Sequence, residues 1–143
     1  MKTQTVLAVA SKGGHWRQLN AMTGAFSGKN VRFVSTDPEL AEFCISECSR
    51  TEWWRGILVA IQMAWIILRV RPDVVVSTGA LPGLVALIVA RMFRARTVWI
   101  DSIANTEGMS LSGRLSRPFA GLWLTQWPDV SRKTGAIYAG AVL

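Results

Sequence analysis

The only histidine of this chain stands at the end of a glycine-containing turn. The segment Ser11–His15 reads Ser-Lys-Gly-Gly-His and directly follows the apolar run Thr5–Ala10. This order predicts a strand, a tight turn and the start of a helix. Two glycines let the backbone approach a ligand closely, and the free N–H groups of a helix start attract an anion. The candidate substrate-binding residues here are Ser11, Gly13 and Gly14.

His15 is the first candidate for positioning or deprotonating a substrate hydroxyl. A purely structural tight turn, capped by the serine or the histidine, is the alternative. The spacing matches neither the dinucleotide-binding fingerprint nor a Walker loop, because the further glycine that the fingerprint requires is missing.

A second glycine loop follows the run Val74–Val76. The loop spans Ser77–Gly83, where glycines flank a proline before an apolar helix. A shaped backbone loop that opens a helix suits an anion or a sugar hydroxyl. Its candidate substrate-binding residues are Thr78, Gly79, Pro82 and Gly83.

A carboxylate stands at the end of a third run, where Asp101 and Ser102 follow Val98–Ile100. Carboxyl ends of parallel strands meet at one edge of a sheet, so we expect this pair near the two glycine loops. Asp101 is the second candidate base, and Ser102 is a candidate substrate contact. An aspartate that caps a helix or ties a loop is the alternative. No Asp-x-Asp pair occurs, and we expect no metal and no cofactor.

Strand-like runs alternate with helical patterns along the chain. Such alternation predicts crossover units in an α/β fold, a Rossmann-like parallel sheet flanked by helices. No repeat or linker is visible, so residues 1–143 are expected to form one domain. The predicted strands are Thr5–Ala10, Val31–Ser35, Asp73–Ser77, Thr97–Ile100, Leu122–Thr125 and Ala136–Ala139. The predicted helices are Trp16–Phe26, Pro38–Cys48, Trp54–Val70, Leu84–Phe93 and Ser112–Phe119. Between them, Thr125–Asp129 is predicted as a compact aromatic turn.

The segment Trp53–Val70 is apolar on nearly every side. Its polar residues after Trp54 are Arg55, Gln62 and Arg69, spaced by seven and therefore on one stripe. A sheet covers one face only, so apolar surface remains for a membrane or another protein. The uncharged stretch Gly56–Leu68 has 13 residues, fewer than the roughly 18 that span a bilayer. The alternatives are a helix in the membrane interface and a buried core helix. The candidate membrane contacts are Trp53, Trp54, Arg55, Trp65 and Arg69.

The charge and the tryptophan content of the chain also favour an anionic surface as its binding partner. The formal charge is +7, arginine makes up most of the 16 basic residues, and there are seven tryptophans. Arginine suits phosphate and lipid head groups, and tryptophan gathers at interfaces. Nucleic acid ranks last as a partner because no recognised motif is present.

The cysteines indicate the compartment. Cys44 and Cys48 are four apart, which predicts two reduced, buried thiols on one helical face. With a single distant histidine they do not complete a zinc site. The first apolar run is shorter than a signal peptide needs. We therefore expect a cytoplasmic location, peripheral on the inner face of the cell membrane.

The loops together resemble a family of sugar transferases. Ser11–His15 and Ser77–Gly83 resemble the two glycine loops in the amino-terminal half of GT-B glycosyltransferases. The closing stretch is similar to the membrane-recruiting subunit of the split UDP-sugar transferase of asparagine-linked glycan assembly, and to its bacterial exopolysaccharide counterparts. This similarity is carried by Asp101-Ser102, Ser110–Leu115, Pro118, Gln126-Trp127-Pro128, Ala136–Gly140 and Leu143.

The resemblance implies the acceptor-side half of a two-component, inverting, metal-independent hexosyltransferase. A small separate protein would bind the UDP-sugar, and the pair would transfer the sugar to a lipid-pyrophosphate-linked acceptor in polysaccharide or glycolipid biosynthesis. The isolated chain would be inactive. The implied partner contacts are Gln126, Trp127, Pro128, Tyr138 and Leu143. The chain departs from the family pattern at Asp101, where a glutamate is usual, and the anchoring helix of eukaryotic members is not seen.

Two alternatives remain open. A non-catalytic membrane scaffold that only recruits its partner would keep its full rate when His15 or Asp101 is replaced. A small nucleotide-binding module would bind a nucleotide by itself, which the missing third glycine argues against.

Overall fold

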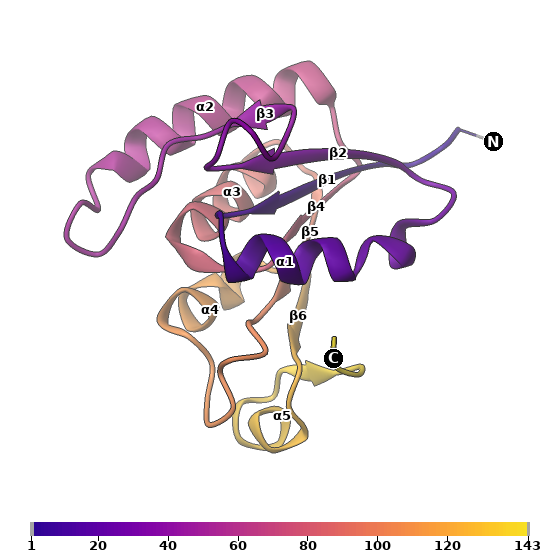
Figure 1. The fold of residues 1–143 in the computed structure, drawn as a ribbon, viewed down its shortest axis with the longest axis vertical. Helices are drawn as coiled ribbons and strands as arrows, with labels where there is room; N and C mark the ends of the chain where they lie inside the picture. Colours follow the sequence, from indigo (N-terminus) through magenta and orange to yellow (C-terminus); the bar gives the residue numbers. More distant parts are fainter. Residues whose placement is uncertain (1, 143) are drawn as a thin grey trace.

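The computed structural model describes residues 2–142, which contain one seven-stranded parallel sheet (Figure 1). The strands lie in the order β3-β2-β1-β4-β5-β6-β7. Their bounds are β1 (Thr5–Ala10), β2 (Asn30–Ser35), β3 (Phe43–Cys44), β4 (Val74–Ser77), β5 (Arg96–Ile100), β6 (Leu122–Thr125) and β7 (Ile137–Tyr138). The six predicted strands are present, and the α/β, Rossmann-like fold is confirmed.

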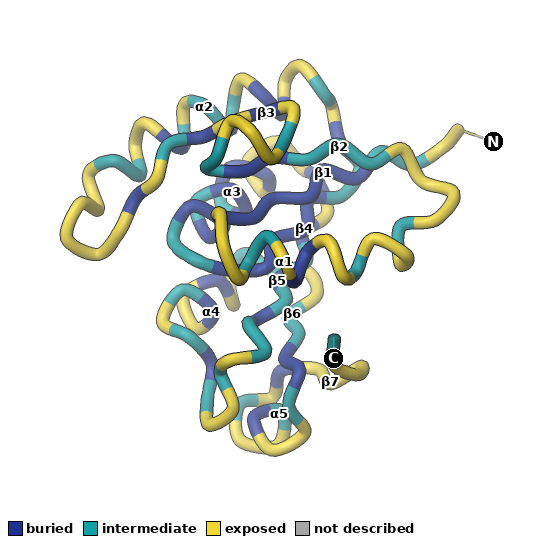
Figure 2. The backbone as a smooth tube through the Cα atoms, viewed as in Figure 1, coloured by how far each residue is buried: buried dark blue, intermediate teal, exposed yellow. Residues whose placement is uncertain are grey.

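Helices cover both faces of the sheet, because successive strand residues point to opposite sides. Leu7 and Val9 pack with α2 and α3, whereas Ala8 and Ala10 pack against Leu19 of α1. Figure 2 shows the buried residues along β1, β4 and the inner side of α3. The helices are α1 (Gly14–Ala21), α2 (Arg55–Val70), α3 (Ala80–Met92), α4 (Leu111–Ser116) and α5 (Pro128–Thr134), with 3-10 turns at Thr23–Phe26 and Arg117–Phe119.

The sheet has a topological switch point between β1 and β4. The chain proceeds outward from β1 to β2 and β3 on one side, and from β4 to β5, β6 and β7 on the other. Loops that leave two such strands diverge to opposite faces and open a crevice at the carboxyl edge. The segment after β1 and the segment after β4 are the two glycine loops of the sequence, so the fold brings both to this crevice.

The predicted helix over Pro38–Cys48 is wrong. An Asp37 side chain accepts a hydrogen bond from the Glu39 N–H, which starts a turn, and the chain then extends as β3 beside β2. Phe43 and Ile45 are buried and Cys44 between them is exposed, which is the alternation of a strand. The two cysteines therefore share no helical face. Both are free thiols, but only Cys48 is buried.

Several element boundaries also differ from the prediction. Helix α3 begins at Ala80, four residues earlier than expected, because Pro82 is tolerated in the first turn of a helix. The predicted aromatic turn after β6 leads into an additional helix, α5, that starts at Pro128. The helix expected over Ser112–Phe119 divides into α4 and a 3-10 turn, and β7 is shorter than expected.

Helix α2 buries one side and exposes another, so the expected apolar surface is confirmed. Val59, Met63, Ile66 and Ile67 face the core. The outer side presents a continuous row of large apolar residues, and no helix within residues 2–142 is long and apolar enough to cross a bilayer. The row consists of Trp54, Ile57, Leu58, Ile61, Trp65 and Leu68, with Trp53 just before it.

Candidate functional site

The two glycine loops hold His15 between them. Its Nδ1 lies 3.0 Å from the carbonyl oxygen of Thr78, and the Thr78 hydroxyl donates to the His15 carbonyl over 2.9 Å. A carbonyl oxygen only accepts hydrogen bonds, so Nδ1 carries the proton in this contact. In the neutral ring Nε2 is then the nitrogen with a free lone pair. The arrangement suits a group that takes a proton from a bound hydroxyl.

Gly79 permits this arrangement for two reasons. Its φ angle is 134°, in a region that side chains rarely adopt, and a Cβ there would lie 2.6 Å from Cε1 of His15. At the other loop, Gly13 has a φ of 86° and precedes α1. A Cβ on Gly13 or Gly14 would meet nothing within 4 Å, so open space lies in front of that turn.

Two helix starts open at the same place. Gly13 precedes α1 and Gly79 precedes α3, and no side chain caps either helix. The first N–H groups of a helix lack internal partners and carry partial positive charge. An anion bound at this edge would find these donors together.

A cleft of about 410 Å³ lies beside His15 at the carboxyl edge. The loop from Ser102 to Ser112 forms one wall, and the start of α3 contributes Ala80. Arg50 reaches the cleft from the segment before α2, and it forms no salt bridge within residues 2–142. The cleft therefore combines one imidazole, one free guanidinium and several small polar groups. Its lining residues are His15, Arg50, Ala80, Ser102, Ala104, Asn105, Ser110, Leu111 and Ser112.

Asp101 lies beneath this wall and is only 1% exposed. Its carboxylate accepts from Trp99 Nε1, Asn105 Nδ2, Ser110 N–H and Ser110 Oγ, at distances of 3.1, 2.9, 3.0 and 2.7 Å. Four donors occupy both oxygens, so the carboxylate has little capacity left for a substrate proton. The geometry favours the loop-tying alternative: Asp101 acts on the cleft through Asn105 and Ser110, which line it.

The other predicted substrate residues divide into two groups. Ser102 lines the cleft, and Thr78 and Gly79 are buried behind His15. Pro82 and Gly83 do not line the cleft, which corrects the prediction for them. Both are buried in the first turn of α3, because that helix begins earlier than predicted. A Cβ on Gly83 would lie 2.1 Å from Ser77 Oγ, so this glycine allows close packing. Ser11 is also buried, and its hydroxyl has no hydrogen-bond partner within residues 2–142.

The predicted partner contacts differ in how far they are exposed. Gln126 is buried, which corrects its expected surface role. Its Nε2 donates a hydrogen bond of 2.9 Å to the Asp101 carbonyl, and its Oε1 accepts one of 2.8 Å from the Val142 N–H. Trp127 is half-buried and donates to the Ile103 carbonyl. Pro128 and Tyr138 are exposed. Leu143 lies outside the described residues.

The candidate membrane contacts lie on α2 or just before it, and all but one are exposed. Trp53, Trp54, Trp65 and Arg69 are exposed. Arg55 is half-buried and forms an ion pair with Glu52.

Sequence reasoning missed Arg50, Asn105 and Ser110. The latter two stand in a polar stretch between Asp101 and α4, where composition alone predicts only a loop. Arg50 stands between the predicted helices Pro38–Cys48 and Trp54–Val70, where no pattern assigns it to a site. Its proximity to the two tryptophans before α2 was the available signal.

Comparison with known proteins identifies the family of this chain. The model of the family described as "Oligosaccharide biosynthesis protein Alg14 like" matches residues 46–142. The UDP-N-acetylglucosamine transferase subunit ALG14 of Eremothecium gossypii is 39% identical over 80 residues, covering 52% of this chain and 36% of that protein. The mouse protein of the same name is 25% identical over 105 residues, covering 66% of this chain and 48% of its own length. The chain thus spans less than half the length of each of these two relatives.

Solved structures support the fold. MurG from Acinetobacter baumannii superposes with a TM-score of 0.72 at 11% identity, covering 89% of this chain and 42% of MurG. The UDP-N-acetylglucosamine 2-epimerase of Rickettsia bellii gives a TM-score of 0.77 at 12% identity, over 99% of this chain and 46% of the epimerase. The expected equivalence to the amino-terminal half of a GT-B protein is confirmed. The match to the family model covers more than half of the sequence, and the chain belongs to the family of Alg14-like oligosaccharide biosynthesis proteins.

Proposed function

We propose that this chain is the acceptor-binding subunit of a two-component UDP-sugar glycosyltransferase. The observation that carries the proposal is the placement of His15. Its free Nε2 stands at a polar cleft beside two uncapped helix starts. The names of the Eremothecium and mouse relatives, which describe a UDP-N-acetylglucosamine transferase subunit, support the reaction class.

The proposed acceptor is a sugar linked to a lipid through a diphosphate. The diphosphate would lie at the starts of α1 and α3, and Arg50 would pair with it from the cleft mouth. This position leaves the sugar hydroxyl near His15. The acceptor oxygen then attacks the anomeric carbon of the UDP-sugar, His15 Nε2 takes the hydroxyl proton, and UDP leaves with the electrons of the broken bond.

The exposed side of α2 would lie on the cytoplasmic face of the cell membrane. Its row of tryptophan, isoleucine and leucine side chains suits the boundary between head groups and acyl chains. Arg50 lies just before this helix and also lines the cleft, so a lipid whose chain remains in the membrane could present its diphosphate there. This placement supports a membrane-borne acceptor over a soluble one.

The donor nucleotide would come from a second protein. The Eremothecium and mouse relatives are named as subunits of a transferase, which supports a separate protein that binds the donor. Pro128 and Tyr138 remain the proposed contacts, near the end of the described chain.

The proposal is tested by purifying the chain from its native host with its bound partner and assaying sugar transfer. Radiolabelled UDP-sugars and a lipid-diphosphate sugar serve as substrates. We expect transfer by the complex and none by either protein alone. Efficient transfer by the isolated chain contradicts the two-component assignment. Direct binding of a nucleotide by the isolated chain favours the nucleotide-module alternative.

A further inference from the structure

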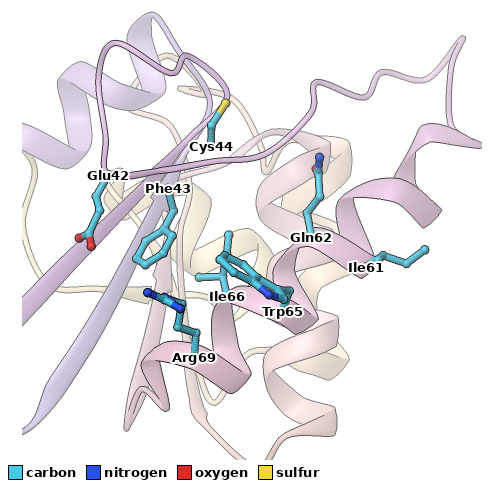
Figure 3. A pocket seen from close by; sticks show the side chains of 8 residues that line it. All are labelled: Glu42, Phe43, Cys44, Ile61, Gln62, Trp65, Ile66 and Arg69. Atoms are coloured by element: carbon cyan, nitrogen blue, oxygen red, sulfur yellow. The ribbon is translucent and has the colours of Figure 1, made fainter.

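A second, larger hollow lies on the opposite end of α2 from the cleft. It measures about 820 Å³ and runs between β3 and α2 (Figure 3). Phe43 forms one wall, and Ile61, Trp65 and Ile66 form the other. The Phe43 and Trp65 rings meet edge to face, with 6.5 Å between their centroids. We call this hollow the β3–α2 groove. Its walls are apolar, and it opens on the same side as the exposed row of α2.

The two ends of the groove differ in chemistry. At one end Gln62 accepts from the Ser46 N–H over 2.7 Å and donates to its hydroxyl over 3.1 Å, which ties β3 to α2. At the other end the Arg69 guanidinium lies over the Trp65 ring, 5.5 Å from its centroid. Figure 3 shows the Arg69 side chain extending toward the Phe43 ring, beside Trp65. The stacking fixes a cation at the rim of an apolar groove.

Arg69 is available to an external anion. It forms no salt bridge within residues 2–142. Glu42 also lines the groove, but its carboxylate is held by Arg32 in a two-point ion pair, which lowers the pKa of Glu42 and raises that of Arg32; the charge of Arg69 adds a smaller lowering of the Glu42 pKa. An apolar channel with one unpaired arginine at its end complements a hydrocarbon chain that carries an anionic head group.

The groove is separate from the acceptor cleft. Helix α2 starts at Arg55, near the carboxyl edge, and Arg69 lies at its far end. A rise of 1.5 Å per residue puts these two arginines roughly 20 Å apart along the helix. The groove and the cleft share no lining residue, and the cleft lies beyond the start of α2, so one head group does not reach both Arg69 and Arg50.

We infer that the β3–α2 groove binds one acyl chain of an anionic phospholipid from the bilayer, with the lipid phosphate at Arg69. This site goes beyond the proposed transferase function, because it holds a lipid that is neither acceptor nor donor. It anchors the domain at the end of α2 remote from the cleft and fixes how the helix lies on the membrane.

Cys44 provides a native reporter of occupancy. It lines the groove and is exposed, whereas Cys48 is buried. Partial desolvation at the groove raises the pKa of the Cys44 thiol, with a smaller contribution from the charge of Asp37, so alkylation is measured at mildly alkaline pH. The full-length chain is treated with a small maleimide and analysed by mass spectrometry. The probe is a short-chain lysophosphatidic acid below its micelle concentration, and the matching uncharged monoacylglycerol is the control.

We expect lysophosphatidic acid to slow the alkylation of Cys44 saturably, and the uncharged lipid to need a much higher concentration. Arg69→Gln should weaken the protection about 10-fold, since a charge-assisted hydrogen bond is lost, and Arg69→Lys should restore part of it. Arg71→Gln removes the same charge from an exposed position outside the groove and should leave protection unchanged. Ile61→Ser should weaken it, whereas Ile57→Ser should not; these residues are 64% and 66% exposed, and only Ile61 lines the groove.

Three results overturn the inference. No protection at any monomeric lipid concentration means that the groove takes no chain. Equal losses for Arg69→Gln and Arg71→Gln mean a diffuse charge effect without a site. Stronger protection by a soluble prenyl diphosphate assigns the groove to the acceptor's own tail. None of these results depends on sugar transfer, so the proposed function is tested separately.

Discussion

At the level of single residues, the site depends on how His15 is oriented. Thr78 offers a carbonyl to Nδ1 and donates its hydroxyl to the His15 backbone, so the ring is held from the neighbouring loop. Gly79 leaves the space that the ring occupies. These features fix the position of the ring, as the proposed role of His15 as a base requires.

Replacing His15 by asparagine separates the proposed catalytic role of the ring from its structural role, the hydrogen bond to the Thr78 carbonyl. The asparagine side chain still carries an N–H that can donate to the Thr78 carbonyl, but it has no basic nitrogen. Assayed with the partner present, we expect the rate of sugar transfer to fall by about 100-fold or more, as for loss of a general base. Thermal unfolding and binding of the partner should change little. A variant with the full transfer rate supports the scaffold alternative.

Gly79→Ala tests the space around the ring. The added methyl group would be strained at a φ of 134° and would displace His15. Gly28→Ala is a matched control, since its φ is 78° and a Cβ there meets nothing within 4 Å. Gly28→Ala should lose about 1–2 kcal/mol of unfolding free energy in urea from backbone strain, and Gly79→Ala should lose more, because its methyl group also clashes with His15. Only Gly79→Ala should also abolish transfer; equal activities would contradict the packing role assigned to Gly79.

Residue types and spacing identified His15 and Gly79 because glycine and histidine in a strand-end loop are distinctive. They did not identify how Asp101 is used. A carboxylate after a strand looks the same in sequence whether it faces a substrate or four internal donors. The difference arises from Asn105 and Ser110, which fold back onto it from a loop without periodic pattern.

At the level of elements, periodicity predicted the long, strongly patterned segments well and the short ones poorly. Helix α2 was found within one residue of its start because its apolar pattern extends over 16 residues. The two-residue strand β3 was missed because a segment of that length is decided by pairing with β2, which sequence periodicity does not show. The β3–α2 groove depends on this pairing and was therefore not predictable.

The outer face of α2 is the proposed membrane contact, so its apolar side chains should determine how strongly the chain binds vesicles. We expect Ile57→Ser combined with Leu68→Ser to weaken binding to anionic vesicles by about 10-fold or more, since each buried apolar side chain contributes roughly 1.5–3 kcal/mol. Flotation with vesicles measures the effect. Leu115→Ser is the control, because Leu115 is also exposed but lies on α4. Raising the salt concentration should weaken the arginine contribution and leave the apolar one. Equal binding of all variants excludes α2 as the membrane face.

At the level of the whole molecule, the strand-helix alternation was sufficient to predict a parallel sheet and its carboxyl edge. The switch point between β1 and β4 then places the glycine loops together without further information. The connection of α1 and of the segment after β6 to Asp101 was not predictable. It is made by two buried glutamines, Gln18 on α1 and Gln126 after β6, which both donate to the Asp101 carbonyl. Such long-range amide contacts have no sequence signature.

These two glutamines support a prediction about how the chain's end is linked to the cleft. Gln18 also accepts from the Ile103 N–H, over 3.0 Å, whereas Gln126 accepts from the Val142 N–H. Replacing either by methionine should cost about 1–3 kcal/mol of unfolding free energy, because buried hydrogen bonds are lost. Hydrogen exchange measured by mass spectrometry should separate them. Only Gln126→Met should speed exchange in the segment that contains Val142, while Gln18→Met should affect the segment after Asp101.

The same pair predicts a functional difference. If the proposed partner docks near Pro128 and Tyr138, its contact is transmitted to the cleft through Gln126, the Asp101 carbonyl and the loop that Asp101 holds. Gln126→Met should then weaken partner binding and lower transfer together, whereas Gln18→Met should lower transfer with partner binding intact. Titration of the purified partner against each variant, followed by transfer assays at saturating partner, measures both effects. Partner affinity that is equal in the two variants would show that the end of the chain and the cleft act independently.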